Sequence, residues 1–288
     1  MSAANRASAV IVDFHAGDVL VGCLDSLANN GVSDVVVVNN GPRGASDASI
    51  VGREVTLVEP EANLGYGRGV NRGVAAVARR ELLIVSNPDV VVHPGAVDAL
   101  IEFMDEHPAV GIAGPTILNV DGSTYPSARL FPNPFLAMMH ALLAPLWPAN
   151  PWTAKYRAPA RDGHVDWVSG AFFITRFELF ERLGGFDERY FMFAEEMDLC
   201  WRVGRAGYSV ATCPAAVITH IEGVSREKAP RAMIIAHHRS AMRFEVQTAR
   251  GWRRLLVPLA MVVLTVRLGV VFALAYLRGR GGFTEDVG

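Results

Sequence analysis

Short apolar runs of strand length alternate with helical patterns from residue 9 to residue 113, and this alternation constrains the fold more than any other feature. The runs at 9–14, 35–38, 55–58, 82–85 and 110–113 are predicted strands. Residues 35–38 are four consecutive valines, which suits a strand buried on both faces of a parallel sheet. Helices are predicted to begin near Asp18, Gly69 and Pro94. The chain is therefore predicted to form an α/β domain with a mostly parallel central sheet flanked by helices.

Ligands of such sheets bind beyond the carboxyl ends of the strands, so functional residues are expected in the loops after residues 14, 38, 58 and 85. Residues 124–162 are rich in proline and aromatic residues, and we expect an irregular excursion there. Regular structure is predicted to resume at 165–175, with helices at 176–183 and 196–206.

The totals of charged residues and cysteines exclude several classes of function. Lys and Arg number 27 against 29 Asp and Glu, so nothing in the net charge of −2 points to nucleic acid as a partner. The three cysteines show no metal-ligand spacing, and their odd number argues against a disulfide framework and for a reducing compartment. Residues 1–9 contain no apolar segment as long as a signal peptide, so we expect no export.

Two loops at predicted strand ends carry residues that suit a phosphate or a metal ion. Asn87-Pro88-Asp89 is typical either of a carboxylate that binds a hard cation between two phosphates or of an Asx-type turn. Residues 63–73 contain four glycines and run from a strand end into a helix, which is typical either of a phosphate loop or of a tight turn with close packing. No acidic residue follows at the spacing of a dinucleotide site, so a nicotinamide enzyme is the least favoured class.

Residues 186–200 hold five carboxylates within twelve residues, interleaved with large apolar side chains. A solvated acidic helix face is one interpretation. The aromatic neighbours favour partly desolvated carboxylates instead, because desolvation raises proton affinity and so suits a general base. His220 follows a predicted strand at 216–219 and is either structural or a contact for a metal or a phosphate.

In this order, the segments resemble the family 2 glycosyltransferases of the GT-A fold, and most of all the rhamnosyltransferase-like bacterial enzymes of cell-wall and surface polysaccharide synthesis. The similarity runs from about Ala9 to about Phe244. Residues 10–15 stand where the family usually has Val-Val-Thr-Tyr-Asn, and 38–40 where it has Val-Asp-Asn. Residues 63–73 match its Asn-x-Gly-Phe-Ala and Asn-x-Gly, and 87–89 match a reduced Asp-x-Asp metal motif.

The second half of the chain continues this resemblance. Residues 167–171, Trp-Val-Ser-Gly-Ala, match an acceptor-side Gly-Ala segment. Residues 195–200, Glu-Glu-Met-Asp-Leu-Cys, stand on the family's Glu-Asp-Val-Asp-Leu-Cys. Residues 220–225 match His-x-x-Gly-x-Ser, whose His commonly reaches the metal.

The resemblance implies a role for each matched residue. The implied catalytic residues are Glu196 and Glu195, and the implied acceptor contacts are Trp167, Gly170, Ala171 and Asp198. Donor binding falls to Asp13, Asn39, Asn63, Gly65, Tyr66, Asn71 and Asn87. The implied ligands of a divalent cofactor, Mg²⁺ or Mn²⁺, are Asp89 and His220.

Two of these positions depart from the family pattern. Asn39 replaces an Asp that typically pairs with the pyrimidine base, although an amide can also pair with uracil or thymine. Glu196 replaces the Asp that is the usual base, so the base is either displaced by one methylene or shared with Glu195.

The implied reaction is a direct displacement that inverts the sugar's configuration, with a dTDP- or UDP-sugar as donor and dTDP-rhamnose favoured. The implied acceptor is a polyprenyl-diphosphate-linked saccharide. A nucleotidyltransferase is a competing enzyme class, although residues 13–17 lack the basic residues it would carry there. A non-catalytic sugar-nucleotide-binding scaffold of a membrane assembly also stays open, given the irregular Asp13, Asn39 and Glu196.

The C-terminal end is basic and then apolar. Eight basic residues between Arg226 and Arg254 precede the apolar run 255–277, which is long enough to span a bilayer. Arg267 at its middle and basic residues on both flanks favour helices that lie in the cytoplasmic leaflet instead. The alternative is a helix buried against the catalytic domain or against a second copy in a homodimer.

We therefore expect a GT-A catalytic domain at 1–225, with a nucleotide-sugar half at about 1–120 and an acceptor half at about 121–225. Residues 226–288 are expected to form a helical, membrane-associating region at the cytoplasmic face of the cell membrane.

Overall fold

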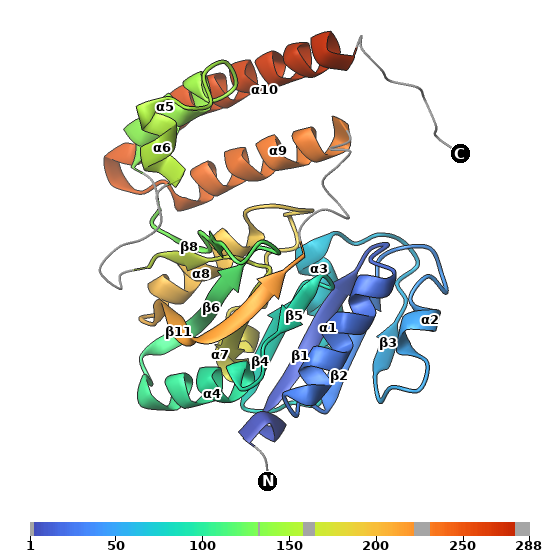
Figure 1. Cartoon of the computed structure of the whole chain (residues 1–288). Coiled ribbons are helices and arrows are strands. Elements are labelled where there is room, and N and C mark those ends of the chain that lie inside the picture. Colours follow the sequence, from blue (N-terminus) through green and yellow to red (C-terminus); the bar gives the residue numbers. More distant parts are fainter. Residues whose placement is uncertain (1–2, 132, 158–164, 222–230, 280–288) are drawn as a thin grey trace. The chain divides into compact units, whose positions relative to one another are not determined.

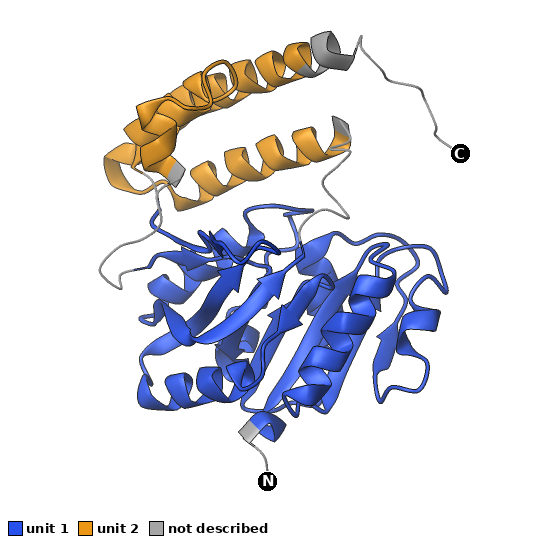
Figure 2. Ribbon diagram, in the orientation of Figure 1, with its two compact units in different colours: residues 1–131, 159–228 blue, residues 132–158, 229–288 orange. Residues whose placement is uncertain are grey.

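The structure is a computed structural model that describes residues 3–131, 133–157, 165–221 and 231–279. It contains two compact units (Figure 2). The sheet unit comprises Met1–Phe131 and Pro159–Lys228, and the helical unit comprises Pro132–Ala158 and Ala229–Gly288. The boundary expected at 225 lies outside the described residues. Residues 132–158, which were expected in the acceptor half of the catalytic domain, belong to the helical unit instead.

Within the described residues, the sheet unit is built on a nine-stranded sheet in the order β3-β2-β1-β4-β10-β6-β11-β5, with β7 paired to β6 (Figure 1). Its strands are β1 Ala7–Asp13, β2 Asp34–Asn39, β3 Thr56–Val58, β4 Leu82–Ser86, β5 Val90–Val92, β6 Val110–Leu118, β7 Thr124–Tyr125, β10 Phe172–Arg176 and β11 Ser209–His220. A separate two-stranded ribbon consists of β8 Ala128–Arg129 and β9 Trp167–Val168.

The first half of the sheet is parallel, as predicted, and the second half is mixed. β1 pairs in parallel with β2 and β4, and β2 pairs in parallel with β3. β10 then runs antiparallel between β4 and β6, and β5 runs antiparallel to β11. The register sets Asp13 beside Asn39 at the carboxyl ends of β1 and β2 and sets His220 opposite Val90. The α/β class is thus confirmed, with a sheet that is less parallel than expected.

Helices cover both faces of this sheet, and each face has its own apolar core. On one face, the regularly spaced apolar residues of α1 and α4 pack against β1, β4 and β10. On the other face, α3, α7 and α8 pack against the alternate residues of the same strands. The helices of the sheet unit are η1 Ala3–Arg6, α1 Asp18–Asn29, α2 Asp47–Ile50, α3 Tyr66–Val74, α4 Ala96–Glu106, α7 Phe177–Arg182 and α8 Glu195–Arg205.

Glycine explains how α3 lies so close to the sheet. A Cβ atom added to Gly73 would lie 2.4 Å from a methyl group of Val10, so no larger residue fits there. The helix begins at Tyr66, three residues before the predicted start at Gly69. The close-packing interpretation of the glycines in residues 63–73 is therefore correct for Gly73.

The helical unit shows that the expectation of an irregular excursion at 124–162 was wrong for much of that segment. Pro134 stands in the first turn of α5 Pro134–Leu143, and the Asn133 side chain caps this helix by accepting from Leu136 N at 2.7 Å. The prolines therefore begin helices here. The other helices of the unit are α6 Pro151–Arg157, α9 Arg231–Thr248, η2 Gly251–Leu256 and α10 Val257–Gly279.

Among the described residues, one helical stretch, Gly251–Leu274, has the length and apolar composition needed to cross a membrane. It packs against α9 and α5 within the helical unit. Leu255, Leu259, Val262 and Val266 recur three and four positions apart along it, and each is at least 50% exposed. They form one uncharged stripe, which we call the α10 stripe.

Candidate functional site

The proposed metal ligands meet because β5 and β11 are paired. This pairing brings His220, at the end of β11, to the turn that follows β4. His220 Nε2 lies 3.0 Å from Asp89 Oδ1, and Asn87 Nδ2 lies 3.4 Å from the same ring nitrogen. The side chains of Asp89 and His220 are largely but not fully buried, with 15% and 11% exposed.

This pair suits a cation that also binds phosphate. Among the described residues, no three His, Cys, Asp or Glu side chains come close enough together to hold an ion. Mg²⁺ typically takes one or two protein ligands and completes its shell with substrate phosphates and water. Asp89 with His220 provides a carboxylate and an imidazole for such a site.

The segment 170–171 joins this turn to the start of α3. Asn87 N donates to Ala171 O at 2.8 Å, and Tyr66 Oη donates to Gly170 O at 2.6 Å. A Cβ atom added to Gly170 would lie 3.4 Å from Glu196 Cβ, so the Glu196 side chain packs directly on this glycine. Five of the residues singled out in the sequence therefore come together here.

The acid pair stands at the first turn of α8, after an unusual stretch of backbone. Phe193 and Ala194 have positive φ angles of 70° and 63°, a conformation that is costly for residues other than glycine. Glu195 is only 4% exposed, and within the described part of the chain its Oε2 has no hydrogen-bond partner. Glu196 is half-buried.

Burial changes the proton affinity of both acids. Desolvation raises the pKa of Glu195 well above its ordinary value, and the negative charge of Glu196 raises it further. Desolvation also raises the pKa of Glu196, while hydrogen bonds from the backbone at the helix start and the positive charge of Arg129 act in the opposite direction. Both carboxyls thus hold protons more strongly than exposed carboxyls do.

Tyr66 links the acid pair with the Asp89 corner. Desolvation raises the pKa of Tyr66 well above its ordinary value, and neighbouring negative charges raise it further. Those charges belong to Glu195, Glu196 and Asp89. The phenol therefore stays protonated and keeps its hydrogen bond to Gly170.

The donor-side residues of β1 and β2 are fully engaged within the protein. Asp13 is 1% exposed, and its two carboxylate oxygens accept from Ala16 N at 3.0 Å and Ser46 Oγ at 2.6 Å. Asn39 is also 1% exposed, and its Oδ1 accepts from Gly41 N at 2.9 Å. Its Nδ2 donates to Pro42 O at 2.8 Å and to Glu59 Oε1 at 3.0 Å.

These bonds use both hydrogens of the Asn39 amide nitrogen and one of the two acceptor sites of its oxygen. The base pairing of Asn39 stays a prediction. Glu59 is the acid that lies beside Asn39 at the end of β2, and it was not among the residues predicted from the sequence. It follows β3 directly and so lies in the loop after residue 58, where functional residues were expected. Hydrogen bonds from Gly44 N and the Asn39 amide lower the pKa of Glu59, so it remains negatively charged.

The glycine-rich loop is attached to the loop that carries the acids. Asn63 Oδ1 accepts from Gly65 N at 2.8 Å, which shapes the turn before α3. Gly65 has a positive φ of 79°, and a Cβ atom there would lie 2.0 Å from Phe191 O. Tyr66 N donates to that same oxygen at 3.0 Å. The positive φ and the close approach to Phe191 O both require glycine at position 65.

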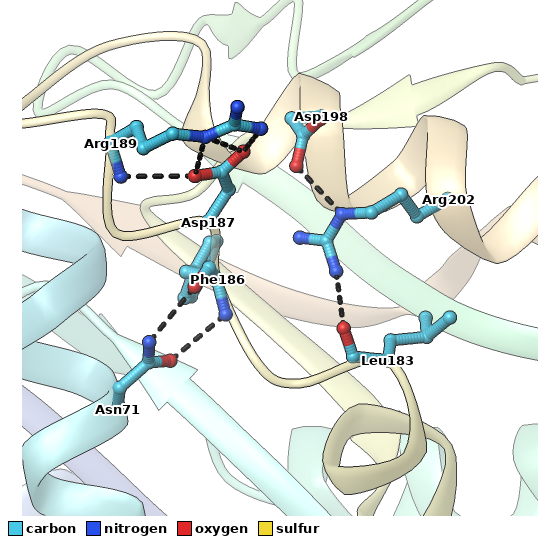
Figure 3. Close-up of polar contacts among 7 residues, drawn as sticks. All are labelled: Asn71, Leu183, Phe186, Asp187, Arg189, Asp198 and Arg202. Atoms are coloured by element: carbon cyan, nitrogen blue, oxygen red, sulfur yellow. Dashed lines mark hydrogen bonds and ion pairs between the residues drawn. The ribbon is translucent and has the colours of Figure 1, made fainter.

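Two residues that were predicted to contact ligands also connect segments within the protein (Figure 3). Asn71 donates to Phe186 O and accepts from Phe186 N, both at 2.9 Å, and so fastens α3 to the loop before the acids. Asp198 is fully buried and lies 2.7 Å from Arg202 Nε. The acceptor contact of Asp198 stays a prediction.

Trp167 remains half-buried on β9, where the Arg129 guanidinium lies 5.6 Å from the centre of its ring. No sequence pattern singled out Arg129, because it falls within the segment expected to be irregular. The three cysteines are buried and free.

Comparisons with known proteins identify the family and agree with this fold. A model of a glycosyltransferase-like family 2 matches residues 4–242. The N-acetylglucosaminyl-diphospho-decaprenol L-rhamnosyltransferase of Mycobacterium tuberculosis is 38% identical over 244 residues, which cover 80% of each chain. The rhamnosyltransferase WbbL of Escherichia coli is 46% identical over 54 residues, which cover 19% of this chain and 20% of that protein.

Solved structures share the fold at low sequence identity. The mannosyltransferase PcManGT from Pyrobaculum calidifontis, in complex with GDP-Man and Mn²⁺, has a TM-score of 0.58 and 16% identity and covers 96% of this chain and 79% of that one. GalNAc-T7 with UDP, GalNAc and Mn²⁺ has a TM-score of 0.58 and 14% identity, with coverages of 82% and 47%. The expected GT-A fold is thereby confirmed, and the chain belongs to the family 2 glycosyltransferases.

Proposed function

We propose that this glycosyltransferase moves L-rhamnose from dTDP-rhamnose to a hydroxyl of a polyprenyl-diphosphate-linked saccharide. The observation that carries the proposal is the 38% identity, over 80% of both chains, to a relative named for L-rhamnosyl transfer to N-acetylglucosaminyl-diphospho-decaprenol. The gathering of Tyr66, Asp89, Glu196 and His220 supports it, because transfer needs a base near the group that stabilises the leaving diphosphate.

Glu196 is the proposed general base. Its carboxyl is half-buried, so an acceptor hydroxyl can reach it, whereas Glu195 is only 4% exposed. Burial strengthens its hold on a proton, which is the property that a base needs. The acceptor oxygen attacks the anomeric carbon from the face opposite the nucleotide, and Glu196 takes the hydroxyl proton. One displacement of this kind inverts the configuration at that carbon.

Asp89 and His220 are the proposed ligands of Mg²⁺ or Mn²⁺. When bound, such an ion supplies a positive charge for the negative charge that develops on the leaving diphosphate. Asn87 lies 3.4 Å from His220 and holds the imidazole in place. Tyr66 and Gly170 fix the other wall of the site through their hydrogen bond of 2.6 Å.

The helical unit is proposed to attach the enzyme to the cytoplasmic face of the membrane, where a lipid-linked acceptor is found. Arg267 lies at the middle of the apolar run, where a charge disfavours a membrane-spanning helix. It acts electrostatically on His237 and His238 of α9. Burial and this arginine lower the pKa of His237 to about 4, so the imidazole is neutral beside the cation. The charged residue therefore faces α9, while the α10 stripe is exposed.

This arrangement suits a helix that lies in one leaflet with its stripe in the acyl chains. Trp252 is 68% exposed and stands beside Arg253 and Arg254, a combination that favours the headgroup region of an anionic membrane.

The test of transfer uses the purified full chain with dTDP-rhamnose or UDP-sugars, a short-chain polyprenyl-diphosphate N-acetylglucosamine, and Mn²⁺, Mg²⁺ or excess chelator. We expect rhamnosylated product with dTDP-rhamnose and metal, and its anomeric configuration, measured by NMR, should be inverted. Full activity in chelator, or an Asp89→Ala variant as active as wild type, would contradict the metal scheme. Donor binding without any transfer would favour the non-catalytic scaffold instead.

The attachment is tested by liposome flotation. Leu259→Glu with Val262→Glu should release the protein from anionic vesicles, because the charges must enter the acyl layer. Val246→Glu is the matched control, since Val246 is a 55% exposed valine on α9, outside the stripe. Equal flotation of the stripe variant and wild type contradicts the attachment. Loss of a dimer in the stripe variant would assign the stripe to a homodimer interface.

A further inference from the structure

Arg129 is a cation that the β8–β9 ribbon holds in a fixed position. Its strand register places it opposite Trp167, and its guanidinium lies over that indole ring at 5.6 Å. The Nε atom donates to Pro126 O at 3.2 Å, and the backbone carbonyl accepts from Asp166 N at 3.0 Å. Stacking on an aromatic ring and one carbonyl bond leave the two Nη groups for other partners.

No acid forms an ion pair with Arg129 within the part of the chain that the structure describes. Other arginines of the sheet unit form ion pairs, such as Arg53 with Asp25 at 2.8 Å and Arg202 with Asp198 at 2.7 Å. The Nη groups of Arg129 have no hydrogen bond to any described residue. An arginine that is half-buried, stacked and not in contact with an acid has already lost part of its hydration and favours an anionic ligand.

The ribbon that carries Arg129 leads directly to the proposed base. Ser169 N donates to Ser127 O at 2.7 Å, and the next residue is Gly170, on which the Glu196 side chain packs. The Arg129 charge is close enough to act on Glu196. Asp89 and His220, by contrast, lie at the ends of β4 and β11, where the donor diphosphate is proposed to bind.

We propose that Arg129, stacked on Trp167, forms an anion subsite for the diphosphate of the lipid-linked acceptor. This inference rests on the proposed function, in which the acceptor hydroxyl reaches Glu196. A diphosphate attached to the same sugar then lies one ring away from that hydroxyl, on the side of the ribbon. The planar guanidinium offers two parallel donors to phosphate oxygens, and the Trp167 ring fixes its plane.

The first experiment compares two acceptors that differ only at the phosphate. One is N-acetylglucosamine on a short-chain polyprenyl diphosphate, and the other is the same sugar on a neutral alkyl chain. For Arg129→Gln we expect kcat/KM to fall about 10- to 100-fold for the diphosphate acceptor and little for the neutral one, as for the loss of a charged hydrogen bond. The KM for the sugar nucleotide should not change.

Arg182→Gln is the matched control, because Arg182 also stacks on an aromatic ring, that of Tyr208 at 5.5 Å, but lies outside the site. It should leave both acceptors unaffected. Arg129→Lys should recover part of the loss, since it restores the charge without the planar donors. An equal loss for both acceptors would mean that Arg129 only positions Glu196, and a raised donor KM would assign Arg129 to the donor diphosphate. Each of these results overturns the inference, as does an Arg129→Gln variant whose kcat/KM for the diphosphate acceptor equals that of wild type.

A second measurement separates this inference from the proposed function. Binding of farnesyl diphosphate in detergent needs no turnover, and it should weaken about 10- to 100-fold in Arg129→Gln while UDP and dTDP affinities stay constant. If wild type binds farnesyl diphosphate through Arg129 but transfers no sugar, the proposed function fails and the subsite stands. If wild type transfers rhamnose and Arg129→Gln binds farnesyl diphosphate normally, the subsite fails alone.

Discussion

The polar residues at the ends of β1 and β2 differ from those at the start of α8 in how fully they are bonded. Asp13 and Asn39 are as buried as Glu195, and each of their side-chain oxygen and nitrogen atoms has a partner inside the protein. Glu195 Oε2 has none among the described residues, and it follows two residues with positive φ.

We expect this difference to distinguish structural residues of the site from the acid pair that includes the proposed base. A satisfied buried polar group stabilises one loop conformation, whereas an unsatisfied one, next to a second acid, raises the free energy of the charged state. Raised proton affinity at such a place is typical of catalytic carboxyls. Variants on the two sides should therefore fail in different ways.

The largest expected effect is on turnover, in Glu196→Gln. Loss of the general base should lower kcat about 10²- to 10⁴-fold, with donor affinity nearly unchanged, because the proton moves only in the transition state. Steady-state kinetics and donor titration measure the two quantities. Glu195→Gln is the matched variant, and a larger kcat loss there than in Glu196→Gln would move the base to Glu195.

The next effect is on stability, in Asp198→Asn. Asp198 is fully buried and paired with Arg202, so neutralising it should lower the free energy of unfolding by about 3 kcal/mol. Glu181→Ala is the control, because its pair with Arg79 is exposed at both ends and should contribute less than about 1 kcal/mol. Urea unfolding compares them. A stable Asp198→Asn with a raised acceptor KM would restore the acceptor role predicted for Asp198.

Local patterns were enough to predict the fold class and the four parallel strands, and the resemblance to the family singled out the residues that meet around Tyr66. Consecutive valines and helical spacing are properties of short windows, and parallel strands end at one edge. Arg129 and Glu59 could not be predicted in the same way. Arg129 reaches Trp167 because β8 pairs with β9, and Glu59 accepts a hydrogen bond from the Asn39 amide because β3 pairs with β2. Such pairings join segments far apart in the sequence.

A smaller effect is expected for Asn71→Ala. Two hydrogen bonds to the Phe186 backbone are lost, which should lower the free energy of unfolding by about 1–2 kcal/mol. Thermal unfolding measures this, with Arg72→Ala, an exposed neighbour on α3, as the control. The donor contact predicted for Asn71 is tested in the same variant. Unchanged stability with a higher donor KM would favour that contact over the structural role.

The smallest effect concerns the pH dependence of stability in Glu195→Gln. Burial and the neighbouring Glu196 charge raise the pKa of Glu195 in the folded chain above its unfolded value. The folded state then binds the proton more tightly than the unfolded state does. Stability from this group is fully present below the unfolded pKa and is lost as the pH rises through the folded pKa.

Glutamine has no such titration, so Glu195→Gln should lose less stability than wild type as the pH rises from 4 to 8. Unfolding in urea at several pH values measures the difference. Asp89→Asn serves as the comparison, because Asp89 lies in the same site but is paired with His220. Parallel stability curves for wild type and Glu195→Gln would show that Glu195 is as well satisfied as Asp13, and the contrast between the two regions would disappear.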